Sequence, residues 1–307
     1  MITALYTHNL CLQHQPGPGH PESPARLHAV LEALDQDVFA ALDRIEAQPA
    51  TRAQLERVHS AELIASIFAQ SPQHDCVQLD PDTVMSPYSL GAALHAAGAV
   101  SMAVDAVIAG RIDRAFCAVR PPGHHATHDT AMGFCLFNNI AVGAAHALAE
   151  HALERVAIVD FDVHHGNGTQ DIFWNDSRVL YISSHQFPLY PGTGARNEIG
   201  AGNVVNAPLP PGAGSAEFRH AYVETLLPAL DRFAPQLMLI SAGFDAHRLD
   251  PLANLNLETD DYAWITQRLV EIAERHAQGR IVSSLEGGYS LTALRQGSAA
   301  HVQALLG

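Results

Sequence analysis

The sequence predicts a single-domain α/β protein in which helices flank a buried parallel sheet. Two observations lead to this fold class. Short, continuously apolar runs alternate with helical patterns along the chain, as they do when helices cover both faces of a parallel sheet. The 307 residues contain no repeat, low-complexity tract or clear linker, and one α/β unit often reaches this length. With 48% hydrophobic and 16% charged residues, the chain has enough apolar surface for a large core.

The first helix is expected to begin at Ser23 and Pro24, which suit the N-cap and the first helical position. Leu27, Leu31 and Leu34 follow at helical spacing and would form its buried face. Further helices, most of them rich in alanine, are expected at residues 60–70, 89–109, 138–150 and 216–233, and another after Thr259.

Five apolar runs between these helices have the character of buried strands. They comprise residues 115–119, 156–161, 179–183, 237–241 and 280–285. Ligands of open α/β sheets bind beyond the carboxyl ends of the strands. Every motif whose side chains could bind a ligand or take part in catalysis follows one of these runs, so we expect a single site at that edge of the sheet.

Composition narrows the classes of partner and compartment. The chain has 17 basic and 32 acidic residues, a formal charge of −15, which argues against nucleic-acid binding and favours basic partners. No Lys or Arg precedes Arg26, so we expect no secretory signal. Polar residues interrupt the apolar stretch 90–110, and no membrane span is expected. The four cysteines lack metal-site or redox spacing. We therefore expect a reduced, cytoplasmic protein.

The segment after the run 156–161 contains potential metal ligands. Asp160, Asp162 and His164 lie at two-residue intervals, and side chains two apart on an extended backbone share one face. Asp245 follows the run 237–241 and offers a further oxygen. Each residue alone has an ordinary explanation, such as a turn, a helix cap or a hydrogen-bonded strand end. Together, three ligands with an open position are typical of a catalytic zinc site.

Two further strand ends carry groups suited to acid–base and electrophilic chemistry. The adjacent His124 and His125 follow a Pro-Pro-Gly turn and could exchange protons with water and a leaving amine. Asp160 and Asn167 are candidates to orient their rings, and only the carboxylate would raise an imidazole pKa. Tyr289, after two glycines, could donate a hydrogen bond to an oxyanion. Taken alone, the histidines could be surface residues and Tyr289 an ordinary half-buried aromatic.

These motifs resemble the histone deacetylase and acetylpolyamine amidohydrolase superfamily, particularly its bacterial members similar to class II deacetylases. The resemblance covers nearly the whole chain. It implies an arginase-like α/β fold with an eight-stranded parallel sheet and one catalytic domain over residues 1–307. Its motifs in this sequence are His20-Pro21-Glu22, residues 120–126, Gly133-Phe134-Cys135, residues 160–168, Pro191-Gly192-Thr193-Gly194, residues 241–247 and residues 286–289.

The resemblance implies a role for each site residue. Asp162, His164 and Asp245 would bind zinc, with ferrous iron as the alternative metal. His124 and His125 would be the tandem histidines, and Tyr289 would polarise the carbonyl. Asp160 would support His124, and Asn167 would lie behind His125. Asn167 stands where class I members have Asp, so we expect His124 and His125 to differ in proton affinity.

The resemblance also implies a structural potassium ion and a substrate channel. Potassium would be bound by Asp160, the Ser183 hydroxyl and backbone oxygens of Asp162, His164 and Ser184, and an ordinary hydrogen-bonded turn is the alternative. The predicted channel residues, each of which could otherwise be a core or turn residue, are Asp82, Gly133, Phe134, Tyr190 and Leu252.

The function that the resemblance implies is zinc-dependent hydrolysis of N-acyl-lysine amides in peptides or proteins. A small acylated polyamine is the alternative substrate, since a negative surface attracts cations, but Leu252 supplies no acidic group for it. A weakly active acyl-lysine-binding regulatory protein is a further alternative. An arginase-like dimanganese hydrolase is disfavoured because the continuation His164-His165-Gly166 lacks the further aspartate that would bridge a second metal.

Overall fold

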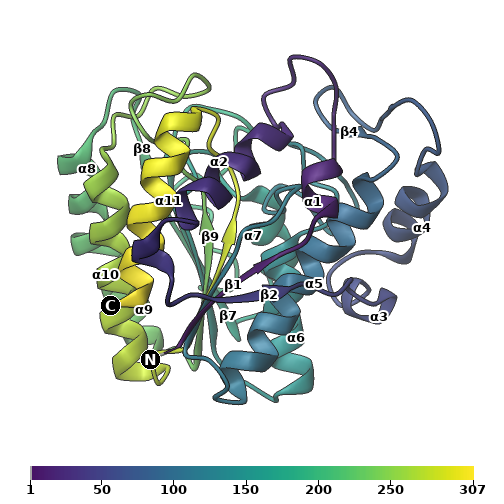
Figure 1. Cartoon of the computed structure of the whole chain (residues 1–307). Helices are drawn as coiled ribbons and strands as arrows, with labels where there is room; N and C mark the ends of the chain where they lie inside the picture. Colours follow the sequence, from purple (N-terminus) through teal and green to yellow (C-terminus); the bar gives the residue numbers. More distant parts are fainter. Residues whose placement is uncertain (1) are drawn as a thin grey trace.

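The computed structural model describes residues 2–307, and its eight main strands form one parallel sheet in the order β2-β1-β5-β10-β9-β6-β7-β8 (Figure 1). The strands of this sheet are β1 (Thr3–Thr7), β2 (Asp43–Glu46), β5 (Arg114–Cys117), β6 (Val156–Asp160), β7 (Val179–Gln186), β8 (Val204–Leu209), β9 (Leu237–Ala242) and β10 (Ile281–Leu285). A separate antiparallel pair consists of β3 (Val77–Gln78) and β4 (Val84–Met85). The predicted eight-stranded parallel sheet is therefore confirmed.

Helices cover both faces of the sheet. Figure 1 shows α8 to α11 on one side and α5 with α6 on the other. The helices are α1 (Leu10–Gln13), α2 (Pro24–Leu34), the 3-10 turn η1 (Asp37–Phe39), α3 (Arg52–Leu55), α4 (Ala61–Gln70), α5 (Ser89–Ile108), α6 (Asn139–Glu150), α7 (Asn167–Phe173), α8 (Ser215–Ala221), the π-helical segment η2 (Tyr222–Leu226), α9 (Leu227–Phe233), α10 (Thr259–His276) and α11 (Leu291–Leu306).

The central strands have the sequence character that a doubly covered sheet requires. Every residue of β5, β6, β9 and β10 is buried, which explains why these strands read as continuous apolar runs rather than alternating patterns. The edge strand β2 has the sequence Asp-Arg-Ile-Glu and is mostly exposed. Its polar composition explains why apolar runs did not reveal it.

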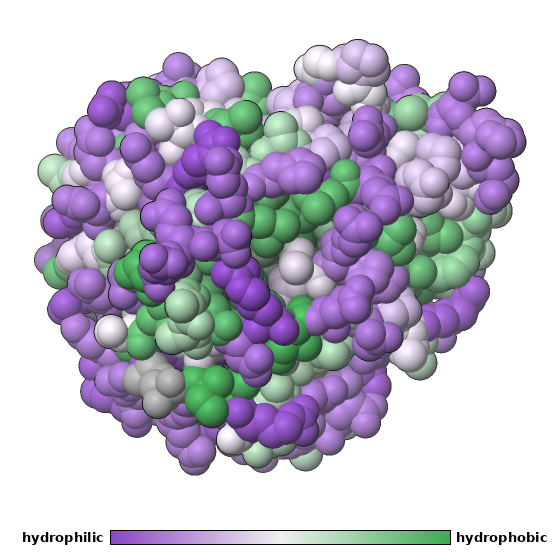
Figure 2. All heavy atoms as spheres, viewed as in Figure 1, coloured by the Kyte–Doolittle hydropathy of each residue, from purple (hydrophilic) through white to green (hydrophobic). Residues whose placement is uncertain are grey.

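Two helical regions, residues 216–233 and α5, show how the structure differs from what their sequences alone would indicate. Residues 216–233 were expected to form one helix, and they form α8, η2 and α9 in succession. Pro228, the second residue of α9, cannot donate a hydrogen bond to the preceding turn, and the wider π segment ends two residues before it, at Leu226. By length and composition alone α5 could cross a membrane, but 67% of its most apolar window is buried inside the protein. The view in Figure 2 is mainly hydrophilic, with small apolar groups between.

The sheet register brings the carboxyl ends of the central strands together. Asp160 at the end of β6 pairs with Ser183 of β7 and with Ser241 of β9. Ser241 in turn pairs with Ser284 of β10, which pairs with Cys117 of β5. The loops after β5, β6, β9 and β10 are therefore neighbours, although up to 168 positions separate Cys117 from Leu285 along the chain. These four loops carry the predicted chemical groups.

Candidate active site

The three predicted zinc ligands converge on one point. Asp162 and His164 lie in the loop after β6, and Asp245 lies in the loop after β9. The Nδ1 atom of His164 is 3.2 Å from Asp162 Oδ1 and 3.2 Å from Asp245 Oδ2. Both carboxylates are buried, with 1% of each residue exposed. One imidazole nitrogen and two carboxylate oxygens in this arrangement suit a zinc-type cation with an open coordination position.

The polar atoms of this trio favour a bound cation. Asp245 Oδ2 is buried and accepts no hydrogen bond from the residues that the structure describes. Burial and the neighbouring Asp162 raise the pKa of Asp245 to about 7. A cation would offset both effects, because it stabilises the charged carboxylate. A Cβ atom on Gly287 would collide with oxygens of both carboxylates, so only glycine leaves room for them.

The tandem histidines have different partners. His124 Nδ1 is 3.0 Å from the carboxylate of Asp160, whereas His125 Nδ1 is 2.8 Å from the amide oxygen of Asn167. The rings lie side by side, with centroids 4.1 Å apart. Because an amide oxygen only accepts, His125 Nδ1 carries the proton and its Nε2 has a free lone pair. The predicted pairings of Asp160 with His124 and of Asn167 with His125 are both present.

The two imidazoles have opposite pKa shifts. Burial lowers the pKa of His124, but the Asp160 and Asp162 carboxylates outweigh it and raise the pKa to about 10. Burial lowers the pKa of His125 well below its usual range, and the charges of His124 and His164 lower it further. At neutral pH His124 is therefore the protonated ring and His125 the neutral one. This difference agrees with the unequal proton affinity that the sequence predicted.

Glu286, in the loop after β10, is bonded to the loop after β5 and to the end of strand β9, a role that was not predicted from the sequence. Its Oε2 atom accepts the N–H groups of Gly123 at 2.7 Å and His124 at 3.2 Å. Its Oε1 atom accepts the hydroxyl of Ser241 at 3.1 Å. Burial raises the pKa of this carboxyl to about 7. Glu286 thus fixes the backbone from which His124 projects.

A buried arginine and a buried aspartate fix the segment that carries Tyr289. Arg26 donates from Nε to the carbonyl of Gly288 at 2.6 Å and from Nη2 to that of Glu286 at 2.5 Å. Its guanidinium also lies 4.8 Å from the centre of the Tyr289 ring. Asp250 accepts the N–H of Tyr289 at 2.7 Å. Burial raises the pKa of Tyr289 well above its usual value, so its hydroxyl remains a hydrogen-bond donor at neutral pH.

Arg26 and Asp250 were not predicted from the sequence to belong to the site. Arg26 pairs with Glu22, which lies four residues earlier in the quoted His20-Pro21-Glu22 motif, at 3.0 Å. That four-residue spacing at a helix start was the available signal. Asp250 has no comparable local pattern, because its partners Leu252 and Tyr289 include a residue 39 positions away.

A channel of about 250 Å³ leads to the site. The lining residues combine the rim aspartate, aromatic walls and the inner site: Asp82, His125, Gly133, Phe134, His164, Leu189, Tyr190, Leu252 and Tyr289. All five predicted channel residues are present, and Leu189 is an addition. Tyr190 and Leu252 are 38% and 37% exposed, which places them at the mouth.

Comparison with known proteins supports the same interpretation. The family model described as histone deacetylase domain matches residues 20–305. The chain belongs to the histone deacetylase family. It is 42% identical to the histone deacetylase-like amidohydrolase of Pseudomonas aeruginosa, over 94% of this chain and 82% of that protein. A probable deacetylase of Archaeoglobus fulgidus is 40% identical over 95% of this chain and 82% of that protein.

A solved structure titled crystal structure of HDA15 HD domain superposes with a TM-score of 0.95 at 37% sequence identity. The match covers 99% of this chain and 88% of that one. Membership of the histone deacetylase family makes the chain a hydrolase of the deacetylase and amidohydrolase type. The predicted fold and family are thereby confirmed.

The residues predicted to bind potassium in this deacetylase-family chain lie close behind the site. Asp160 and Ser183 are register partners on β6 and β7. Asp160 Oδ1 accepts the N–H of Asp162 at 3.1 Å, and the Ser183 hydroxyl is 2.9 Å from His185 Nδ1. The Ser184 hydroxyl is 3.1 Å from that of Tyr222. These contacts bring the predicted residues together, and the potassium assignment stays a prediction.

A second cluster of possible metal ligands differs from the deacetylase-type site in its spacing. Asp105 Oδ1 is 2.7 Å from Nε2 of His146 and 2.7 Å from Nε2 of His151. These are hydrogen-bond distances, shorter than the 3.2 Å separations around His164. Arg57 donates to Nδ1 of His146 at 2.8 Å. The Nε2 atom of His146 therefore carries the ring proton and faces Asp105. We therefore assign this cluster as a hydrogen-bonded link between α5 and α6.

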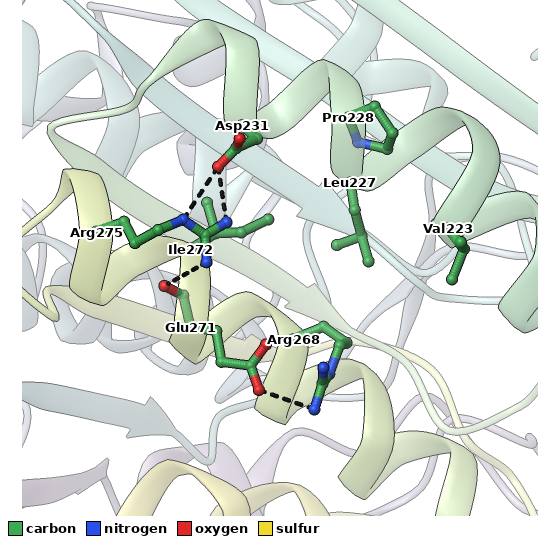
Figure 3. A pocket seen from close by; sticks show the side chains of 8 residues that line it. All are labelled: Val223, Leu227, Pro228, Asp231, Arg268, Glu271, Ile272 and Arg275. Carbon is green, nitrogen blue, oxygen red and sulfur yellow. Dashed lines mark hydrogen bonds and ion pairs between the residues drawn. The ribbon is translucent and has the colours of Figure 1, made fainter.

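A surface groove of about 360 Å³ lies beside α9 and α10 (Figure 3). Asp231 pairs with Arg275 at 2.7 Å, and Glu271 pairs with Arg268 at 2.8 Å. These ion pairs neutralise the charges around it. None of the predicted site residues lines the groove, so it forms no part of the deacetylase-type site.

Proposed function

We propose that the protein is a zinc-dependent lysine deacylase that hydrolyses N-acyl-lysine amides, acetyl-lysine first, to a carboxylate and a free lysine. One observation carries this proposal: the trio of ligands lies at the inner end of a narrow channel beside a neutral imidazole and a tyrosine hydroxyl. A channel with aromatic walls fits an alkyl stem, and the inner groups fit an amide.

The residues divide the chemistry as follows. A divalent cation bound by Asp162, His164 and Asp245 would polarise the acyl carbonyl and acidify a water molecule. His125 accepts the proton of the attacking water at Nε2, because a lowered pKa keeps the ring neutral and the bond from Nδ1 to Asn167 leaves the Nε2 lone pair free.

The remaining steps use protonated groups. Tyr289 donates its hydroxyl hydrogen to the oxyanion that develops on the acyl carbon, since a raised pKa keeps it protonated. His124 is the protonated ring at neutral pH. It supplies positive charge beside the reaction and a proton toward the departing lysine nitrogen.

The channel mouth supports a peptide substrate. Phe134 and Tyr190 would hold the lysine stem, and Leu252 would add apolar contact at the mouth. Asp82 uses Oδ1 to accept the N–H of Gly133 at 3.2 Å. Its second carboxylate oxygen would accept N–H groups of the substrate backbone.

Acylated polyamines are the second candidate, because a net charge of −15 attracts cations. Among the lining residues Asp82 is the only carboxylate, and Leu252 is apolar, so we rank acyl-lysine first. A weakly active acyl-lysine-binding protein ranks third, since Tyr289 and both histidines are in place. Ferrous iron is the alternative metal, and a structural potassium ion is proposed beside Asp160. The free thiols of all four cysteines fit the proposed cytoplasmic location.

The test is the variant Tyr289→Phe, assayed on an acetyl-lysine peptide and on acetylspermidine. Loss of one oxyanion donor should reduce kcat about 10²- to 10³-fold, while the metal content stays that of the parent. Tyr88→Phe is the matched control, because Tyr88 is 53% exposed and lies outside the channel. An unchanged kcat would remove Tyr289 from the mechanism. A strong preference of the parent for acetylspermidine would reverse the order of substrates.

A further inference from the structure

The channel wall at Phe134 has an unusual backbone. Met132 and Cys135 exchange two backbone hydrogen bonds, with the N–H of Cys135 2.9 Å from the carbonyl of Met132 and the reverse bond at 3.1 Å. Between them Gly133 and Phe134 have φ angles of 58° and 69°. Two consecutive left-handed residues define a type I′ turn, which normally takes asparagine and glycine. A bulky phenylalanine in this conformation is strained, and the surroundings must hold it.

Two side chains of one neighbouring segment hold this turn. Asp82 Oδ1 accepts the N–H of Gly133 at 3.2 Å, and Thr83 Oγ1 accepts the N–H of Phe134 at 3.1 Å. The Thr83 hydroxyl donates in turn to Asp82 Oδ1 at 3.1 Å. Thr83 is 1% exposed, so water does not compete for these bonds. The Thr83 hydroxyl therefore has one well-defined orientation, in which it accepts from the N–H of Phe134 and donates to the carboxylate of Asp82.

The holding segment is itself fixed. Asp80 Oδ1 accepts the N–H groups of Asp82 at 3.0 Å and Thr83 at 2.6 Å. The carbonyl of Thr83 accepts the N–H of Leu79 at 2.8 Å. His20 is 3.1 Å from the carbonyl of Asp82, and its ring packs edge-on against Phe134 at 4.9 Å. The position of Phe134 is thus set from a rigid support rather than by the substrate.

We propose that Thr83 is a positioning residue for the substrate channel: its hydroxyl holds Phe134 in the left-handed conformation, so that the wall is formed before the lysine stem enters. The inference rests on the proposed function for its substrate, and it adds a residue outside the channel lining. A preformed wall lowers the cost of ordering on binding. Loss of the hydroxyl should therefore weaken substrate binding more than it slows the chemical step.

The first experiment needs no activity. Amide hydrogen exchange is measured by mass spectrometry over residues 130–136 in the purified, metal-containing parent and in Thr83→Val, Thr83→Ala and Thr83→Ser. Both variants that lack the hydroxyl should exchange this segment at least about tenfold faster, since the N–H of Phe134 loses its acceptor. Thr83→Ser keeps an acceptor and should match the parent. Peptides of α10 report whether the fold as a whole has been weakened.

Either of two exchange results would overturn the proposal. One is unchanged exchange over residues 130–136 in both Thr83→Val and Thr83→Ala. The other is faster exchange in α10 and in residues 130–136 alike, which would mean a general loss of stability. Having two variants of different size guards against one that fails to fold.

The second experiment is a double-mutant cycle with Phe134→Ala on an acetyl-lysine peptide. In the parent background, Thr83→Val should raise KM about tenfold and leave kcat within about twofold. In the Phe134→Ala background it should change KM by less than about twofold, because the group it positions is gone. Equal tenfold effects in both backgrounds would refute the proposal. An inactive parent would instead refute the proposed function, and the exchange data would still decide the role of Thr83.

Discussion

Replacement of Arg26 by methionine separates positioning from chemistry at this site. Arg26 lies outside the substrate channel, yet it donates to the carbonyls of Glu286 and Gly288, directly before Tyr289. It is 1% exposed, so water cannot easily replace these bonds. Methionine has a similar length and packs well, but it donates nothing. The variant therefore removes the hydrogen bonds and leaves most of the packing.

The expected magnitudes follow from this geometry. Each buried carbonyl left without a donor costs about 1–3 kcal/mol. The two carbonyls together give a loss of roughly 2–6 kcal/mol in the free energy of unfolding. The lost ion pair between Arg26 and the buried Glu22 adds to this, so roughly 2–6 kcal/mol is the lower bound. A displacement of the reacting group by about 1 Å can reduce the rate about 10²-fold. We therefore expect Arg26→Met to lower kcat/KM about 10²-fold, with the metal content unchanged because Arg26 touches none of the three ligands.

Three measurements check the prediction: urea unfolding, kcat/KM on an acetyl-lysine peptide and metal content. Arg295→Met is the matched control, because Arg295 pairs with Glu32 on the surface and its loss should be nearly neutral. In the Tyr289→Phe background, Arg26→Met should add little to the loss of kcat, since both act through the same hydroxyl. Parent-like kcat/KM in Arg26→Met, or full additivity with Tyr289→Phe, would refute this reasoning.

Three further predictions concern the histidine pair, the metal ligands and the metal. Asn167→Asp places a carboxylate against His125 and should raise the pKa of that imidazole. The acidic limb of the kcat/KM profile, where His125 must lose its proton, should therefore move up by about 1–2 pH units. A limb that stays in place would argue against His125 as the base. Gly287→Ala puts a Cβ against the oxygens of Asp162 and Asp245. It should weaken metal binding at least about tenfold, measured by competition with a chelator. The control is Gly91→Ala, whose Cβ meets only the end of the Leu10 side chain and which should bind metal as the parent does. Zinc at about 100 times its Kd should stabilise the chelator-treated protein by about 2.7 kcal/mol, seen as a rise in Tm of several degrees; an unchanged Tm would mean that zinc does not bind the folded state.

The sequence predicted the central part of the fold and not its edges. Five strands are buried on both faces, and a strand buried in this way has a continuous apolar sequence that can be recognised. They are β5, β6, β7, β9 and β10. The strands β1, β2 and β8 were not identified from the residues. The pattern of β2 is charged, and that of β8 includes Asn206 and Pro208, so neither resembles a buried strand. The total of eight strands came from the family resemblance.

The site was predicted where its residues are close in sequence. The spacing of Asp162 and His164 indicated a metal site, and the tandem histidines could be recognised because they are adjacent in the sequence. The long-range partners were harder, because nothing in the local sequence shows that Glu286 accepts from Gly123 or that Thr83 accepts from Phe134. Such pairs are set by sheet order and loop packing. The resemblance named the residues that we propose to contact substrate and metal, and the structure added those that hold them in position.

The most direct test of the central claim is a zinc titration of the chelator-treated protein, followed by turnover of an acetyl-lysine peptide. Asp162, His164 and Asp245 form one cluster, so turnover should rise from near zero and level off at about one zinc per chain. The same titration with ferrous iron under anaerobic conditions would rank the two metals. Turnover that persists in the chelator-treated protein, or that requires two zinc ions per chain, would contradict the account.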